Sequence, residues 1–195
     1  MSRFPVRSID VGYGNTKFVL REDGDGIHCD LFPSLAPIAS SVQGLDGGIL
    51  AKHRIVPIEI DGLRYGVGKD SNLSLQGVNA RTLDATFSQS NEYLALVRGA
   101  LLYMGATEIT LLVVGLPVTT ALTMGPALEK RLTGTHVLSE SGGSRKVVNV
   151  HRVKALAQPL GAFIDYATRT GRGEQMPGCY GDYAQSSGRA HVRAG

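Results

Sequence analysis

Apolar and polar residues alternate along the first third of the chain, and this alternation predicts β-strands. Three consecutive strands are expected, at residues 6–11, 16–21 and 26–32. Two further strands, residues 55–60 and 63–67, flank Asp61-Gly62, a pair that favours a two-residue hairpin turn. The chain is therefore expected to begin with an antiparallel meander, followed by a second hairpin.

The period of the pattern changes after residue 86, from two to about 3.6. Apolar residues then recur at helical spacing, as Leu94, Val97, Leu101 and Met104. Ser90 or Asn91 is the expected N-cap of this helix, and Gly105 lies just past its end. The chain thus changes from strands to a capped amphipathic helix.

Further strands and helices alternate beyond this helix. The predicted elements are one buried strand over Ile109–Leu116, a helix over Thr120–Leu132 whose start Gly125-Pro126 resets, strands at Val137–Leu138 and Val147–Val153, and a helix over Gln158–Arg169. A meander followed by such units predicts an α/β fold with a mixed sheet. Beyond Thr170 the periodicity is lost, which predicts a disordered tail.

Composition adds few constraints. Hydrophobic residues make up 43% of the 195 and charged residues 19%, as in a globular protein with a core, and no apolar run is long enough for a transmembrane helix. Of the two cysteines, Cys29 lies two residues from both Ile27 and Leu31, so it shares their face of the strand. We expect it to point inward with them, as a buried thiol in a reduced cytoplasm. Residues 141–195 contain eight Lys or Arg and only three Asp or Glu, so this segment is basic. No aromatic residues interleave with these charges in a nucleic-acid-binding pattern, which favours a solvated tail over nucleic-acid binding.

The segment Asp10-Val11-Gly12-Tyr13-Gly14-Asn15-Thr16-Lys17 carries the strongest candidate chemistry. A strand ends in a carboxylate suited to hydrated Mg²⁺, and the glycines that follow let backbone N–H groups approach phosphate oxygens. Lys17 supplies a cation for a terminal phosphate. The same residues also form ordinary hairpin turns, so the segment predicts ATP binding only together with other features.

Four other segments follow in the order of a known family. They are Phe32-Pro33-Ser34, Tyr65-Gly66-Val67-Gly68, Gly115-Leu116-Pro117-Val118 and Ala155-Leu156-Ala157-Gln158-Pro159-Leu160-Gly161-Ala162. With the first motif they resemble the actin-like ATPases of plasmid segregation, of the ParM/StbA type, and the related PRTRC-system protein D group. The resemblance covers residues 7–166 and implies a ribonuclease H-like actin/chaperone ATPase domain I with a mixed sheet. It places this domain at residues 1–168, with a small inserted subdomain at about 36–88.

The resemblance also assigns roles to residues. It implies that Asp10 holds Mg²⁺ through water and that Gln158 orients the hydrolytic water, as catalytic residues. It assigns the ATP phosphates to Gly12, Tyr13, Gly14, Asn15, Thr16 and Lys17. Tyr13 departs from the small or hydroxyl residue common at its position, so a hydroxyl near the γ-phosphate is not assured. Gln158 could instead make a local hydrogen bond at a helix start. Gly115-Leu116-Pro117, at a strand end, could line the nucleotide cleft or be only a strand-ending turn.

The family's second Asp-x-Gly-x-x-Thr hairpin and its adenosine loop do not appear in the sequence. A truncation or a frame change near Thr170 would explain both this and the character of residues 169–195. Three candidate functions follow from the resemblance. It implies first that the chain is the N-terminal half of a cytoplasmic, filament-forming ATPase that uses ATP and Mg²⁺ and a DNA-binding adaptor in plasmid segregation. Alternatively, it is a non-hydrolysing module that binds a partner or caps filaments, or a fragment of a sugar-kinase-type enzyme. No membrane partner and no direct contact with nucleic acid are expected.

Overall fold

The N-terminal meander is present as the sequence predicts, in a computed structural model that describes residues 5–23, 26–38, 54–71, 86–139 and 145–158. Its strands are β1 (Val6–Val11), β2 (Asn15–Asp23) and β3 (Gly26–Pro33). They pair antiparallel, β1 with β2 and β2 with β3. All described residues belong to one compact unit, residues 1–158.

Two later strands complete a five-stranded sheet. β7 (Leu111–Leu116) pairs parallel with β1, and β10 (Val153–Ala157) pairs parallel with β7. The strand order is β10-β7-β1-β2-β3, with a parallel half and an antiparallel half. This confirms the predicted mixed sheet. The parallel pairs β1–β7 and β7–β10 are each joined by a crossover connection, so residues far apart in sequence meet at the strand ends.

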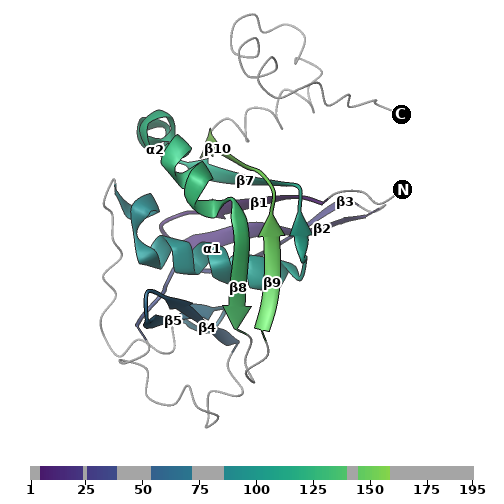
Figure 1. The fold of residues 1–195 in the computed structure, drawn as a ribbon, viewed down its shortest axis with the longest axis vertical. Coiled ribbons are helices and arrows are strands. Elements are labelled where there is room, and N and C mark those ends of the chain that lie inside the picture. Colours follow the sequence, from purple (N-terminus) through teal and green to yellow (C-terminus); the bar gives the residue numbers. More distant parts are fainter. Residues whose placement is uncertain (1–4, 24–25, 39–53, 72–85, 140–144, 159–195) are drawn as a thin grey trace, which may run out of the picture. The chain divides into compact units, whose positions relative to one another are not determined.

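Two helices pack against the sheet (Figure 1). α1 (Asn91–Met104) packs on β1 and β2, and the 3-10 helix η4 (Phe87–Gln89) precedes it. The predicted caps are confirmed: Ser90 Oγ accepts a hydrogen bond from Tyr93 N at 3.0 Å, and Gly105 has a φ of 71°. The core beneath α1 includes the rings of Phe18, Phe32 and Tyr103, whose centroids lie 5.6–6.2 Å apart.

The second hairpin, β4 (Ile55–Ile60) and β5 (Leu63–Gly68), packs on α1. Asp61 and Gly62 have φ values of 52° and 77°, as the predicted two-residue turn requires. A Cβ on Gly68 would lie 2.0 Å from the carbonyl oxygen of Arg54, so this strand end accepts only glycine. The hairpin falls within the predicted inserted subdomain, whose boundaries stay a prediction.

Two predicted strands each divide into two. Ile109–Leu116 was expected as one strand, but Glu108–Ile109 form β6 and only Leu111–Leu116 form β7. Val147–Val153 likewise divides into β9 (Arg145–Val150) and β10. β6 and β9 belong to a separate three-stranded sheet with β8 (Gly134–Ser139). Both chain segments leave this sheet together and pair again, in parallel, in the five-stranded sheet.

The second helix, α2 (Val118–Leu132), also differs from its prediction. It begins two residues earlier than Thr120, and Pro126 lies inside it instead of resetting its start. The ring of Pro126 removes the hydrogen bond to the carbonyl of Leu122, whose residue is 82% exposed, so water can satisfy that carbonyl. The predicted helix Gln158–Arg169 lies outside the described residues except for Gln158.

The prediction of a buried Cys29 was wrong. Cys29 does share a strand face with Ile27 and Leu31, but Ile27 is 68% exposed and Leu31 46%. The opposite face of β3 carries Phe32, which packs under α1 and is fully buried. Alternation identified the residues that share a face without indicating which face the helix covers.

Candidate functional site

Asp10 lies at the carboxyl end of β1, in the middle of the sheet. It is directly opposite Lys17 on β2 and Gly115 on β7, and Gly115 is opposite Leu156 on β10. Residues that are opposite one another across paired strands project to the same face. The side chains of Asp10, Lys17 and, on β10, Leu156 therefore project to one face of the sheet.

Gln158 follows β10 directly and contacts Asp10. Its Nε2 donates a hydrogen bond to Asp10 Oδ1 at 2.7 Å, across a separation of 148 residues. Asp10 Oδ2 accepts no hydrogen bond from the described residues. The two residues predicted to be catalytic are thus in contact, and one carboxylate oxygen stays available to a further ligand.

Gly115 makes this contact possible. A Cβ at Gly115 would lie 2.9 Å from Asp10 Oδ1 and 3.0 Å from Gln158 Cγ. The two side chains therefore meet in the space that any larger residue at this position would fill. Of the two interpretations of Gly115-Leu116-Pro117, the structure favours a segment that lines the site.

The hairpin after Asp10 is held in shape from within. Gly12 N donates to Asn15 O at 3.1 Å, and Ser34 N donates to Gly14 O at 3.0 Å. Thr16 is fully buried, and its hydroxyl lies 2.9 Å from that of Ser34. The Phe32-Pro33-Ser34 segment therefore anchors the hairpin. The N–H of Gly12 and the hydroxyl of Thr16 are already bonded within the protein.

The remaining hairpin residues face solvent. Tyr13 is 49% exposed, and a Cβ at Gly14 would meet no atom within 4 Å. Lys17 is exposed, and its ammonium forms no ion pair with the described residues. Tyr13, Gly14 and Lys17 leave room and a free positive charge beside the carboxylate of Asp10.

A cavity of about 180 Å³ opens beside this hairpin. We call it the Asp10 cavity, after the residue that precedes the hairpin turn. Its lining includes Val11, Gly12 and Tyr13 from the end of β1 and the hairpin, Gly115 and Leu116 from β7, and Gln158. The remaining lining comes from η4, α1 and the start of α2, through Phe87, Ser88, Tyr93, Pro117, Thr119 and Thr120. The site thus combines an amide and a glycine hairpin around one concave surface. The strand-end carboxylate of Asp10 contacts that amide, and the free lysine lies opposite Asp10 on β2.

Residues 8–161 match the family model described as the actin-like proteins N-terminal domain. The chain belongs to this family. Its fold is that of an actin-like domain I, in which the mixed sheet and its crossover helix carry the site.

Solved structures of actin-like proteins share the fold. An AlfA filament bound to AMPPNP matches with a TM-score of 0.62 at 18% identity, over 83% of this chain and 57% of that one. An archaeal actin homolog, Ta0583, matches with a TM-score of 0.61 at 27% identity, over 89% and 51%. The apo psk41 ParM protein matches at 0.60 and 21%, over 82% and 51%. The chain spans about half the length of these proteins, and no curated protein sequence matches it.

Tyr93 of this actin-like domain was not predicted as a site residue. It lies in the first turn of α1, is only 2% exposed and lines the cavity beside Gln158. Its hydroxyl has no hydrogen-bond partner among the described residues. Burial and, secondarily, the negative charge of Asp10 raise its pKa, so the phenol stays protonated and acts as a donor. The only sequence signal is a tyrosine, with its polar hydroxyl, among the apolar positions of the helix.

We expect Tyr93→Phe to raise the free energy of unfolding of the ligand-free protein by about 1 kcal/mol, because it removes a buried hydroxyl that pairs with nothing. Tyr103→Phe is the matched control, since the hydroxyl of Tyr103 donates to Arg54 O at 2.9 Å and its loss lowers stability. Urea denaturation measures both variants. Equal destabilisation by the two substitutions would contradict the expectation.

Two negative findings concern the described residues only. None of their helices is long and apolar enough to cross a bilayer. They also contain no group of three or more His, Cys, Asp or Glu side chains placed to hold a metal ion. A single carboxylate nevertheless suits Mg²⁺, which proteins commonly bind through one or two carboxylates, several waters and the phosphates of a substrate.

Proposed function

We propose that this chain binds Mg²⁺·ATP at the Asp10 cavity and serves as the nucleotide-binding N-terminal half of a filament-forming ATPase in plasmid segregation. The observation that carries the proposal is the 2.7 Å hydrogen bond between Gln158 Nε2 and Asp10 Oδ1. It joins two motifs 148 residues apart, next to a glycine hairpin and an unpaired lysine. Such a constellation fits phosphoryl chemistry better than it fits a turn between strands.

Asp10 is the residue that would hold Mg²⁺ through water. Its Oδ1 is bound by Gln158 and its Oδ2 is open within the described part of the chain, so the carboxylate has both an orienting partner and a free acceptor. When bound, the metal ion would neutralise the phosphate charge. The hydrogen bond from Gln158 limits how the carboxylate can turn, and partners of this kind orient the groups that hold a metal ion.

The hairpin would hold the phosphates. Tyr13, Gly14 and Asn15 are exposed at its tip, and the space beside Gly14 lets a phosphate approach the backbone. Gly12 contributes through the tight turn, since its N–H is bonded to Asn15. Thr16 contributes by anchoring the hairpin to Ser34. Lys17 would supply positive charge to a terminal phosphate.

Gln158 has the chemistry to orient a water molecule. Its Nε2 donates to Asp10, which leaves Oε1 to accept a hydrogen bond from the water. Fixing the amide through Asp10 limits the directions in which Oε1 can point, and positioning of this kind is the main contribution of a protein to phosphoryl transfer. Hydrolysis by the whole protein is therefore part of the proposal.

The larger assembly belongs to the same proposal. The AlfA structure is a filament bound to AMPPNP, and this supports self-association by a protein that contains this domain. A DNA-binding adaptor and a cytoplasmic location complete the proposed segregation system. We also propose domain boundaries at residues 1–168, an inserted subdomain at about 36–88, and a separate tail at 169–195.

Calorimetric titration of the wild-type chain with Mg²⁺·AMPPNP tests nucleotide binding. We expect Lys17→Gln to weaken binding about tenfold, because it removes one charge-assisted contact to a phosphate. Lys146→Gln on β9 removes the same charge away from the cavity and should leave the affinity unchanged. Equal weakening in both variants would show a general charge effect. No binding by the wild-type chain would refute the proposal for this chain.

A further inference from the structure

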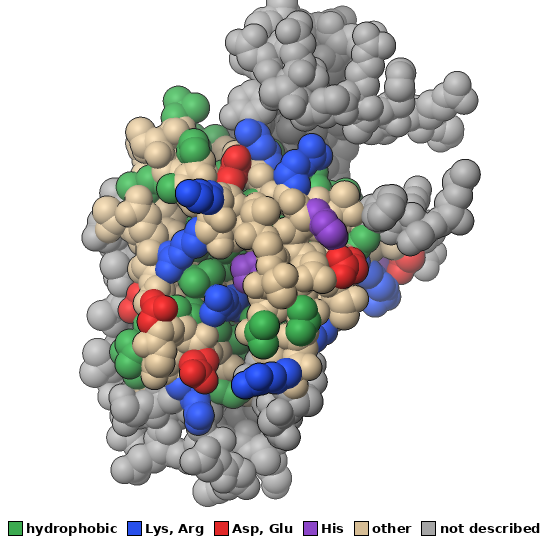
Figure 2. Space-filling view, viewed as in Figure 1, with side chains coloured by type: hydrophobic (Ala, Val, Ile, Leu, Met, Phe, Trp, Pro, Cys, Tyr) green, Lys and Arg blue, Asp and Glu red, His purple; other side chains and the backbone are tan. Residues whose placement is uncertain are grey.

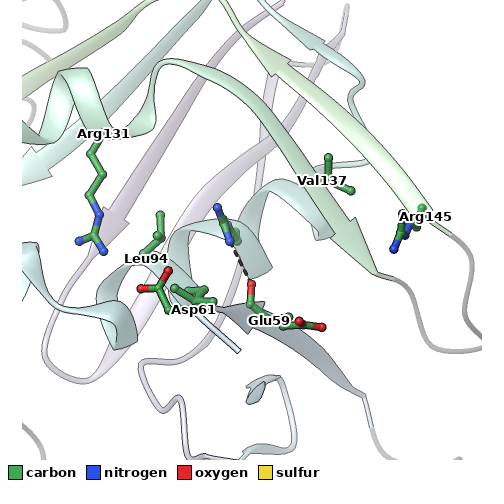
Figure 3. Close-up of a pocket in the computed structure, with 8 residues that line it drawn as sticks. Glu59, Asp61, Leu94, Arg131, Val137 and Arg145 are labelled. Atoms are coloured by element: carbon green, nitrogen blue, oxygen red, sulfur yellow. Dashed lines mark hydrogen bonds between the residues drawn. The ribbon is translucent and has the colours of Figure 1, made fainter. Parts of the chain in front are cut away.

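A second and larger cleft lies on the other side of α1. Its volume is about 590 Å³, and it is bordered by the end of β4, α1, the end of α2 and the β8–β9 hairpin (Figure 3). It shares no lining residue with the Asp10 cavity. Basic side chains run across this face of the molecule from α2 to the β8–β9 hairpin (Figure 2). The proposed nucleotide site makes no use of this cleft.

Arg98 projects from α1 into the cleft. Its Nη1 donates to the backbone oxygen of Glu59 at 3.0 Å, the contact drawn as a dashed line in Figure 3. Its Nε is buried and has no partner within the described residues. Burial and the nearby charge of Arg131 lower the pKa of Arg98, whereas Asp61 opposes this shift. The guanidinium thus keeps an unused donor and a charge that its hydrogen bond does not neutralise.

Arg131, near the end of α2, also lines the cleft. Among the described residues, its guanidinium donates hydrogen bonds only to neutral groups. Its Nη1 donates to the backbone oxygens of Gln89 and Ser90 at 2.6 and 3.0 Å, and its Nη2 donates to Asn91 Oδ1 at 2.8 Å. These bonds hold its guanidinium in place. No described carboxylate pairs with Arg98 or Arg131 within salt-bridge distance. Two fixed like charges that share one hollow favour an anion between them.

The rest of the lining limits the chemistry of that anion. Arg145 at the start of β9 adds a third guanidinium, while Glu59 and Asp61 place two carboxylates at the border. Asp61 already accepts a hydrogen bond from Asn91 Nδ2 at 3.1 Å. A dianion gains more from three guanidiniums than it loses to two carboxylates, and guanidinium forks match phosphate oxygens.

The cleft also has an apolar wall. Leu94 and Ile60 line its base, and Val137, which is 54% exposed, lines its β8 side. The volume is several times that of a water-sized site, so a bare inorganic phosphate would leave most of it to solvent. We propose that this cleft binds a phosphate ester, with the phosphate on Arg98 and Arg131, Arg145 at the mouth, and the organic part against Val137.

Titration of the full chain with phenyl phosphate, followed by isothermal calorimetry, tests the site. We expect binding in the wild-type protein, at least a tenfold loss of affinity in Arg98→Gln, and a smaller loss in Arg145→Gln. Arg152→Gln removes the same charge between β9 and β10 and should bind as the wild type does.

Each result decides the proposal. Binding that is kept in both Arg98→Gln and Arg145→Gln would place the phosphate outside this cleft and overturn it. Equal loss in Arg98→Gln and Arg152→Gln would overturn it as a general charge effect, and so would no binding by the wild type. If Arg98→Gln does not fold, the exposed Arg145→Gln carries the test. Inorganic phosphate should bind more weakly than phenyl phosphate, since it makes no contact with Val137.

Discussion

Asp10→Ala is expected to abolish the Mg²⁺-dependent part of nucleotide binding. Asp10 holds Gln158, which lines the smaller cavity, through a 2.7 Å hydrogen bond to its Oδ1, and no described lining residue of that cavity carries a carboxylate of its own. The substitution removes the acceptor for the metal-bound water and frees the amide. Outer-sphere ligands of this kind are worth about 10- to 100-fold in metal affinity. Calorimetry with AMPPNP, in the presence and absence of Mg²⁺, measures the loss.

Asp30→Ala is the matched control for that experiment. Asp30 is a carboxylate on β3 that pairs with Lys69 Nζ at 2.6 Å, and it lines neither cavity. Its removal changes the net charge by the same amount, so nucleotide affinity should stay at the wild-type value. Unchanged affinity in Asp10→Ala would refute the metal-binding role of Asp10 and, with it, the proposed function.

Gly68→Ala is expected to lower the free energy of unfolding by about 3 to 5 kcal/mol, which combines backbone strain with overpacking. Gly68 has a φ of 152°, and an added Cβ would lie 2.0 Å from Arg54 O and 2.7 Å from Tyr103 Oη. The contact is with backbone, which cannot move aside as a flexible side chain can. The backbone of Arg54 before β4 and the Gly68 end of β5 must therefore move apart, and the side chain of Tyr103 on α1 must shift, to accept the methyl group.

Gly105→Ala separates these two causes. Gly105 also has a positive φ, 71°, but an added Cβ there would meet nothing within 4 Å. It should cost only about 1 kcal/mol, the strain of the left-handed conformation alone. Urea denaturation of both variants gives the comparison. A similar small loss in Gly68→Ala would show that the hairpin end relaxes without disturbing the packing on α1.

The elements that the sequence predicted well carry their signals locally. The turn at Asp61-Gly62 and the cap at Ser90 need only their immediate neighbours, and both formed as expected. The division of the apolar run at Thr110 could not be predicted in this way. Whether a strand continues or passes to another sheet depends on its partners, and here β9 and β10 change sheets alongside it.

The site shows the same division between local and distant information. The hairpin itself was predictable because glycines and an asparagine between two apolar runs favour a turn, and β1 and β2 pair around it as expected. The contact between Asp10 and Gln158 followed only from resemblance, since no local pattern relates residues 148 positions apart. Tyr93 was missed because a tyrosine at a helical core position resembles any other large apolar residue. Its unpaired hydroxyl appears only once the cavity around it has formed.

The contact between Glu129 and β10 bears on how the domain avoids aggregation. β10 is an edge strand of the five-stranded sheet, and an open edge can pair with the strand of another molecule. Glu129 Oε1 accepts a hydrogen bond from Ala155 N at 2.9 Å and lies 3.4 Å from Lys154 Nζ. A side chain of α2 thus occupies a backbone donor that an incoming strand would need. Protein copies that meet at high local concentration are thereby discouraged from joining through this edge of their sheets.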